Sequence, residues 1–200
     1  MNEVREKILY TAFSMFVNDG YKAVSISELV KRCGCTKGAI YHYFENKEQI
    51  FNEILENFFC PVLASLCGQI EALEGSALQR FDAFFSLYEA ACTEVSDYPD
   101  FPELEYGIYY LLIEGSKYNP DFRVAVAALY ASLFRAAEGI IRLGCDEGVF
   151  SLNLDAAAAG RMLVSLTEGA YLLWIVNKSE SLEKVFASAK SFARAALRAG

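Results

Sequence analysis

The sequence predicts an all-α protein in which short helices near the N-terminus precede longer ones. Apolar residues recur at intervals of three and four along almost the whole chain, which is the spacing of one helix face. No stretch shows the alternation of apolar and polar residues that a half-buried strand requires. The prolines and several glycines separate the periodic segments, where helices are expected to end.

The first two expected helices are bounded by residues that are typical of helix ends. The first helix spans residues 3–18, and Gly20 follows it with the left-handed backbone conformation that commonly closes a helix. Either Ser25 or Ser27 caps the second helix, because a serine side chain can accept a hydrogen bond from a free backbone N–H group.

A second glycine turn leads into a short third helix and then into a fourth. Gly34 makes the turn, and the hydroxyl of Thr36 caps the third helix. Asn46 caps a fourth helix over residues 47–59. Pro61 is expected to break that helix, because proline lacks the N–H group that a continuing helix uses.

The rest of the chain is expected to form longer helices. One connection, around residues 98–102, contains two prolines and separates the first of these helices from the second. The helices are expected at residues 77–95, 103–117, 122–143, 155–176 and 182–199.

The third helix, residues 36–43, has an unusual solvent-facing side. At 100° per residue its apolar residues fall on one arc. The opposite arc carries a cation, a glycine, a phenol and an imidazole, namely Lys37, Gly38, Tyr41 and His42. Each also has a purely structural interpretation: Lys37 as a solvated charge, Gly38 as a weak point of the helix, Tyr41 as a half-buried aromatic ring and His42 as an ordinary surface residue. Together they suit contact with phosphates and base edges, so we interpret residues 25–44 as a helix-turn-helix.

Hydroxyl groups at helix starts and a further lysine complete the predicted DNA-binding set. Ser25, Ser27 and Thr36 offer hydroxyl and N–H donors to phosphate oxygens, and Lys47 is expected to reach the same backbone. The net charge of −8 does not oppose this interpretation, because residues 1–47 hold seven basic and five acidic residues. Acidic groups beyond the screening length of about 8 Å barely weaken phosphate contacts.

Residues 2–62 resemble the DNA-binding domain of the tetracycline-repressor (TetR) family. The resemblance rests on the corner at residues 19–21, the Ser-Ile-Ser at 25–27 and the run Thr-Lys-Gly-Ala-Ile-Tyr-His-Tyr-Phe at 36–44, before Asn46 and Lys47. The chain departs from the usual pattern at residues 30–31, 33 and 35, where only altered packing is expected.

The resemblance implies both a function and a second domain. Members are homodimeric transcription regulators, most often repressors, whose C-terminal domain binds a small molecule. It implies a helix-turn-helix DNA-binding domain at residues 2–62, a helical ligand-binding and dimerisation domain at residues 63–200, and a palindromic operator in double-stranded DNA as partner. The alternatives are a helical ligand-binding module without DNA binding and a small helical enzyme.

Two long helices are candidates for the interface of such a homodimer. Residues 122–143 and 155–176 are apolar on more than one face and contain small residues that permit close helix packing. We expect them to form a four-helix interface with their symmetry mates. The alternative is that the same faces pack within one chain.

Aromatic residues concentrate between residues 81 and 118, in two stripes at helical spacing. One interpretation is a packed core, and the other is an apolar cavity with phenol groups that orient a hydrophobic or aromatic effector. The candidate ligand-binding residues are Phe81, Phe84, Phe85, Tyr88, Tyr106, Tyr109, Tyr110 and Ile113.

No catalytic residue, metal site or cofactor is predicted. The six cysteines form no CxxC pair, and the one histidine is assigned to the third helix. No P-loop or dinucleotide-binding motif occurs. No apolar run approaches the roughly 20 residues of a membrane span. The N-terminus does not resemble a signal peptide, so a cytoplasmic location without membrane contact is expected.

Overall fold

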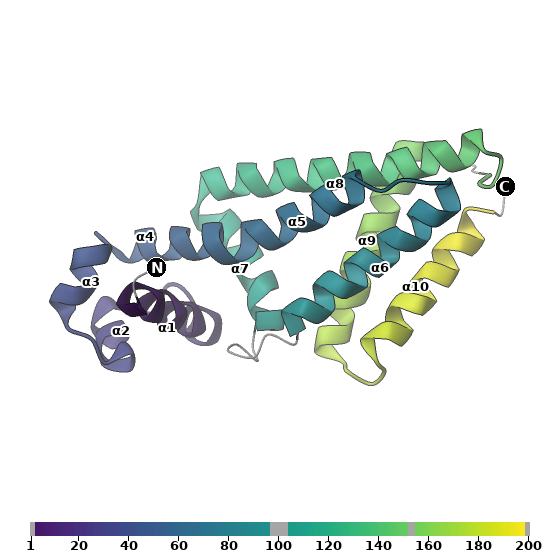
Figure 1. The fold of residues 1–200 in the computed structure, drawn as a ribbon. Coiled ribbons are helices and arrows are strands. Elements are labelled where there is room, and N and C mark those ends of the chain that lie inside the picture. Colours follow the sequence, from purple (N-terminus) through teal and green to yellow (C-terminus); the bar gives the residue numbers. More distant parts are fainter. Residues whose placement is uncertain (1–2, 97–103, 152–154, 199–200) are drawn as a thin grey trace. The chain divides into compact units, whose positions relative to one another are not determined.

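The structure is a computed structural model that describes residues 3–96, 104–151 and 155–198, and the regular structure of these residues is helical (Figure 1). The all-α prediction is therefore confirmed. The loop predicted around residues 98–102 lies outside the described residues. In chain order the elements are α1 (Glu3–Asp19), α2 (Ile26–Cys33), α3 (Lys37–Tyr43), α4 (Lys47–Ile54), η1 (Leu55–Phe59), α5 (Cys60–Glu71), α6 (Ala77–Ser96), α7 (Leu104–Tyr118), α8 (Pro120–Asp146), α9 (Ala156–Val176) and α10 (Leu182–Ala196).

The chain forms two compact units. Unit 1 comprises Met1–Pro61 and Tyr98–Val126, and unit 2 comprises Val62–Asp97 and Ala127–Gly200. The division after Pro61 lies beside the predicted domain boundary. The residues of α7 were predicted to belong to the C-terminal domain, whereas α7 packs here with the N-terminal helices.

Unit 1 has an apolar core that α7 closes. Its fully buried side chains include Ile8, Phe13, Phe16, Leu29, Ile40, Phe44, Ile50 and Phe51. A Cβ atom at Gly107 of α7 would lie 2.8 Å from Val17 and 3.1 Å from Phe13 of α1. The two helices therefore approach so closely that any side chain at this position would displace them.

The helix that begins at Lys47 does not end before Pro61, which corrects the sequence-based expectation. It continues as α5 to Glu71, and the turn before the proline, Leu55–Phe59, is wound as a π-helix. Proline cannot donate the usual helical hydrogen bond, and its ring clashes with the preceding turn. A widened turn is a common way for a helix to tolerate such a disturbance and continue.

Unit 2 is built from the longer helices. Phe81, Phe84 and Phe85 of α6 are buried in its core. A Cβ atom at Gly160 of α9 would lie 2.6 Å from the backbone nitrogen of Glu138, so α8 and α9 cross closely within the chain.

The end of α8 differs from the sequence-based expectation. Gly144 lies inside α8 rather than after it. A glycine is needed at this position because the Phe150 ring occupies the space of a side chain, 1.9 Å from an added Cβ atom. Gly148, with a φ of 69°, lies in the turn that follows.

Two helical stretches are longer and more apolar than the sequence predicts. Lys47–Glu71 and Pro120–Asp146 have the length and composition of a membrane span, with mean hydropathies of 1.3 and 1.6. Core helices of soluble proteins meet the same criterion, so it is weak evidence for a membrane. Only 28% of the Pro120–Asp146 window is buried.

Candidate nucleic-acid interface

Ser25, and not Ser27, caps α2. The Ser25 hydroxyl accepts a hydrogen bond from the N–H of Glu28 at 3.2 Å, and the Glu28 carboxylate accepts one from the Ser25 N–H at 3.3 Å. This reciprocal pair is a capping box. The Ser25 side chain therefore fixes the start of α2, whereas Ser27 is exposed on its first turn.

The turn between α2 and α3 is set by a glycine and a threonine. Gly34 has a φ of 66°, in the left-handed region, and its N–H donates to the Val30 carbonyl at 3.1 Å. The Thr36 hydroxyl then accepts a hydrogen bond from the Ala39 N–H at 3.1 Å. These contacts end α2 and start α3 within three residues, as a helix-turn-helix requires.

The helix α3 has one buried and one exposed side. Ile40 is fully buried in the core of unit 1. Lys37, Gly38, Tyr41 and His42 are exposed, and Tyr41 is 49% exposed. The Lys37 ammonium lies 5.8 Å from the centre of the Tyr41 ring, so a cation and a phenol sit together on the outer side. The expected exposure is confirmed, and the contact with DNA stays a prediction.

Lys47 is held within the protein, contrary to its predicted role as a free phosphate ligand. Its ammonium donates to the carbonyls of Tyr21 at 2.7 Å and Val24 at 2.9 Å, and it lies 4.4 Å from the centre of the Tyr21 ring. Partial burial lowers the pKa of this lysine. Lys47 thus ties the start of α4 to the segment that precedes α2.

Tyr21 also connects this segment to α7. The Tyr21 N–H donates to the hydroxyl of Tyr110 at 2.7 Å, and the Tyr21 ring packs on Phe51 and Tyr118. A second link joins Asn119 to Asn52 of α4 at 2.7 Å. Sequence reasoning missed this role of Tyr110, which it assigned to a ligand cavity, because a hydroxyl gives no sign of a backbone partner 89 residues away.

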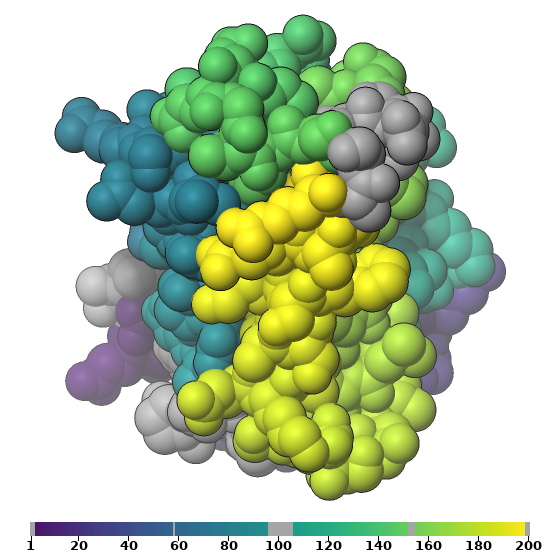
Figure 2. Space-filling view, turned by 90° about the vertical axis from the view of Figure 1, so that its right-hand side faces the viewer, coloured from purple at the N-terminus to yellow at the C-terminus, as the bar shows by residue number. Residues whose placement is uncertain are grey.

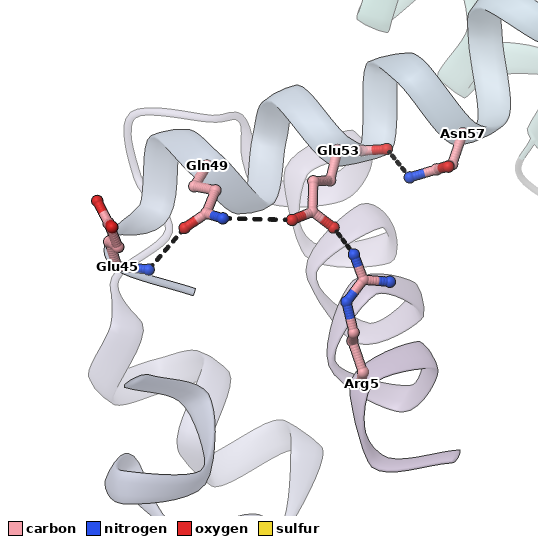
Figure 3. Close-up of polar contacts among 5 residues, drawn as sticks. All are labelled: Arg5, Glu45, Gln49, Glu53 and Asn57. Atoms are coloured by element: carbon pink, nitrogen blue, oxygen red, sulfur yellow. Dashed lines mark hydrogen bonds and ion pairs between the residues drawn. The ribbon is translucent and has the colours of Figure 1, made fainter. Parts of the chain in front are cut away.

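A polar chain holds the segment that follows α3 (Figure 3). The N–H of Glu45 donates to the Gln49 side chain at 2.7 Å, Gln49 donates to Glu53 at 3.4 Å, and Glu53 pairs with Arg5 of α1. The Arg5 guanidinium also lies 5.5 Å from the centre of the Phe44 ring. The end of α3 is therefore tied to α1 and α4.

Several cations of unit 1 serve the fold rather than a ligand. Arg5 and Lys47 are engaged as described, and Arg32 pairs with Asp19 at 3.2 Å. The count of seven basic residues before residue 48 therefore overstates the positive charge that faces a ligand. Lys37 lies on the exposed side of α3 and Lys31 on that of α2.

The predicted ligand-binding residues are divided between the two compact units, four in each. Phe81, Phe84, Phe85 and Tyr88 are buried in unit 2, where their rings pack on one another. Tyr106, Tyr109, Tyr110 and Ile113 belong to unit 1, where Tyr106 is 51% and Ile113 66% exposed. Both side chains are thus exposed on their own unit, and a contact of either with a ligand stays a prediction.

A shallow depression of unit 2 lies between α6 and α10, and Phe85 is the predicted residue that lines it. Within the part of the chain that the structure describes, no group of three or more histidine, cysteine or carboxylate side chains is placed to hold a metal ion.

Comparison with known proteins identifies relatives along most of the chain. Residues 8–54 match the family model "Bacterial regulatory proteins, tetR family". The chain is 47% identical over 178 residues to the uncharacterized HTH-type transcriptional regulator YxaF of Bacillus subtilis, a match that covers 88% of this chain and 87% of that relative. It is 27% identical over 114 residues to the HTH-type transcriptional repressor KstR2 of Mycolicibacterium smegmatis, covering 50% of this chain and 56% of that relative.

The fold is also similar to that of solved structures. A transcriptional regulator from Saccharomonospora viridis, solved in complex with choline, matches with a TM-score of 0.70 and 22% sequence identity, over 96% of each chain.

Proposed function

The chain belongs to the TetR family of bacterial transcription regulators, which bind DNA and are not enzymes, and we propose that it is a homodimeric repressor of a palindromic operator. A small molecule bound by the C-terminal helical domain, residues 63–200, causes the protein to be released from the operator or retained on it. The protein acts in the cytoplasm, where bacterial DNA lies. The alternative of a ligand-binding module without DNA binding is not favoured, because the side chains suited to DNA are present and exposed.

The exposed side of α3 carries this proposal. Lys37 supplies a cation for phosphate oxygens, and Tyr41 and His42 supply polar ring atoms for base edges. Gly38 leaves room for the DNA backbone beside the helix, since nothing but the Thr36 hydroxyl lies within 4 Å of its added Cβ atom. The Lys47 side chain contributes by fixing the preceding segment, and its backbone N–H is left as the phosphate donor.

The dimer is supported by apolar side chains that lie exposed on unit 2. On α9, Met162, Gly169, Leu173 and Val176 recur at the spacing of one helix face, and Leu173 is 70% and Val176 75% exposed. On α10, which Figure 2 shows uncovered along its outer side, Phe192 is 68% exposed. A second copy of the chain would bury both faces.

We therefore propose α9 and α10 as the dimer interface, in place of the predicted pair of helices, residues 122–143 and 155–176. Gly160 is used for the close crossing of α8 and α9 inside one chain, so that part of the small-residue pattern has an intrachain explanation. The helices α9 and α10 pack extensively on each other, so they can present one continuous surface to a second copy.

A footprinting experiment tests the proposed function. The full chain is bound to the intergenic DNA upstream of its own gene, and protection is mapped along both strands. A dimer with two helix-turn-helix domains should protect two inverted half-sites whose centres lie about one helical turn of DNA, roughly 34 Å, apart. Protection of one half-site, or none in this DNA and its neighbouring promoters, would contradict the proposal.

The effector proposal has a separate basis. A neighbour with the same fold was solved with choline, a small organic cation. A ligand weakens operator binding only by its different affinity for the DNA-binding and the released conformations. The buried aromatic set of unit 2 supplies an apolar environment for such a molecule.

A further inference from the structure

Two cysteines flank the glycine of the turn between α2 and α3. Cys33 is the last residue of α2, Gly34 follows it as the C-cap, and Cys35 comes directly before Thr36, the N-cap of α3. Only altered packing was expected of the two cysteines. The turn itself is set by the backbone of Gly34 and the hydroxyl of Thr36, so neither thiol is needed to form it.

The backbone of the turn gives the two cysteines the separation that a disulfide requires. Gly34 has a φ of 66° and a ψ of 23°, close to the mirror image of helical backbone. In helical geometry of either hand, Cα atoms two residues apart lie about 5.5 Å from each other. The Cα atoms of disulfide-bonded cysteines are most often about 5.5–6 Å apart. The pair can therefore be bridged without a large movement of the main chain.

The two thiols lie against each other, and one of them can be reached from solvent. The Cys35 thiol is in hydrogen-bonding contact with the Cys33 thiol. Cys33 is 1% exposed in the core of unit 1, whereas Cys35 is half-buried. A small reagent can thus reach Cys35 first, and Cys33 lies where it can react next.

The neighbours of Cys35 determine how readily it reacts. Burial, followed by the contact with Cys33, raises the pKa of Cys35, and the ammonium of Lys7 on α1 acts in the opposite direction. Cys35 therefore stays a thiol near neutral pH, whereas the thiolate is the reactive form. In a reducing compartment the pair stays reduced, and it reacts when an oxidant is abundant.

We propose that Cys33 and Cys35 form a reversible disulfide on oxidation by a peroxide, and that this disulfide weakens operator binding. The Cys35 thiolate attacks one oxygen of hydrogen peroxide, which gives a sulfenic acid and releases hydroxide. The Cys33 sulfur then displaces hydroxide from the sulfenic sulfur, so that the S–S bond forms as the S–O bond breaks. In total, two thiols lose two hydrogen atoms, and one peroxide is reduced to two molecules of water.

The disulfide acts on α3 through the turn. Bonded sulfur atoms lie about 2 Å apart, which is closer than two thiols in contact. Either Cys33 leaves its buried position or Cys35 moves inward, and both movements alter the backbone around Gly34 that leads into α3. The exposed side of α3 then no longer fits the operator. This consequence rests on the proposed function, whereas formation of the disulfide rests on the turn alone.

The test oxidises the full chain with hydrogen peroxide and measures the bond and DNA binding separately. Trypsin cleaves after Arg32 and Lys37, so both cysteines fall in one peptide, residues 33–37, which has no further cysteine. After treatment with an alkylating reagent, we expect this peptide to carry no alkyl group and to be two hydrogen atoms lighter than its reduced form. In a gel shift with the upstream DNA, the affinity should fall at least tenfold and return after dithiothreitol is added.

Three variants show whether the effect depends on this pair. Cys35→Ser should bind the upstream DNA like the reduced, unaltered protein and keep its affinity in peroxide. Cys33→Ala leaves no polar group in the core and should behave in the same way. The matched control Cys145→Ser removes an exposed cysteine of unit 2, so it should remain as sensitive to peroxide as the unaltered protein.

Three outcomes would overturn the inference. They are alkyl groups on both cysteines of the peptide after peroxide treatment, an unchanged DNA affinity while the disulfide is present, and an equal loss of affinity in Cys35→Ser. The two readouts also separate this inference from the proposed function. If the reduced protein binds the DNA but forms no disulfide, the inference alone fails. If the disulfide forms but the reduced protein does not bind the DNA, the proposed function fails.

Discussion

Each of the two units of this protein contains a tyrosine that we propose matters for function, and the two differ in solvent exposure. Tyr41 of unit 1 is 49% exposed on α3, whereas Tyr88 of unit 2 is 3% exposed and has no hydrogen-bond partner among the described residues. An exposed phenol suits a large partner that approaches from outside, such as DNA. A buried phenol suits a small molecule that enters between helices. The chemistry of a site therefore depends on burial as much as on residue type.

The units also differ in how they satisfy buried polar groups. In unit 1 the polar side chains around Tyr21 end on backbone atoms, since Lys47 donates to two carbonyls and Tyr110 accepts an N–H. Such bonds hold α3 and its neighbours in fixed positions. In unit 2 the buried Tyr88 hydroxyl makes no hydrogen bond to the residues that the structure describes. We infer that the bonds around Tyr21 make unit 1 rigid around α3.

The largest expected effect comes from charges placed on the apolar surface of unit 2. In the double variant Leu173→Glu with Phe192→Glu, dimerisation would bury carboxylates without partners, which costs several kcal/mol. We expect a monomer in sedimentation analysis and a loss of operator affinity of at least about a hundredfold, although α3 is untouched. Thr93→Glu, on an exposed position of α6, is the control. A double variant that stays dimeric would show that the interface lies elsewhere.

A smaller effect is expected from the hydroxyl that links α7 to the segment before α2. Tyr110→Phe leaves the Tyr21 N–H without its acceptor and should lower the free energy of unfolding by about 1 kcal/mol. Urea unfolding measures this change, and Tyr41→Phe, which removes an exposed hydroxyl, should have almost no effect. If both variants unfold alike, the rigidity assigned to unit 1 does not depend on this bond.

The fold was largely predictable, because helix ends are determined by local chemistry. Gly34, Thr36 and Asn46 mark the ends of short helices in sequence as they do in the structure. The π-helical turn before Pro61 was not predictable, because it depends on how neighbouring helices compensate for a missing hydrogen bond. The exposed side of α3 followed from helical periodicity, since the segment has a single apolar arc.

The sites that depend on distant partners were not predictable. Lys47 was assigned to DNA and Tyr110 to a ligand, and both instead bind backbone atoms near Tyr21. Neither Tyr130 nor Glu168, which accepts its hydrogen bond, was singled out, because a lone carboxylate on a helix resembles a solvated charge until the phenol opposite is known. Spacing along the chain carries no information about contacts between helices that are far apart in sequence.

The smallest expected effect concerns alkaline pH. Burial, with the charge of Glu168, holds the pKa of Tyr88 and Tyr130 above the unfolded value of 10.0. Their contribution to stability is therefore fully present below pH 10 and is lost as the pH rises further. Absorbance of tyrosinate should show a fraction that ionises only on unfolding, and Tyr88→Phe should reduce that fraction. Ionisation of all tyrosines in the folded protein near pH 10 would contradict the burial of these two tyrosines.

The most direct test of the account compares two phenols of nearly equal exposure in a gel shift with the upstream DNA. Tyr41 on α3 is 49% exposed and Tyr106 on α7 is 51% exposed, so alanine at either position removes a similar surface group. We expect Tyr41→Ala to lose operator affinity by about tenfold or more, as the loss of a base or phosphate contact should. Tyr106→Ala should bind like the unaltered protein. Equal affinities of the two variants would show that the exposed side of α3 is not the surface that contacts DNA.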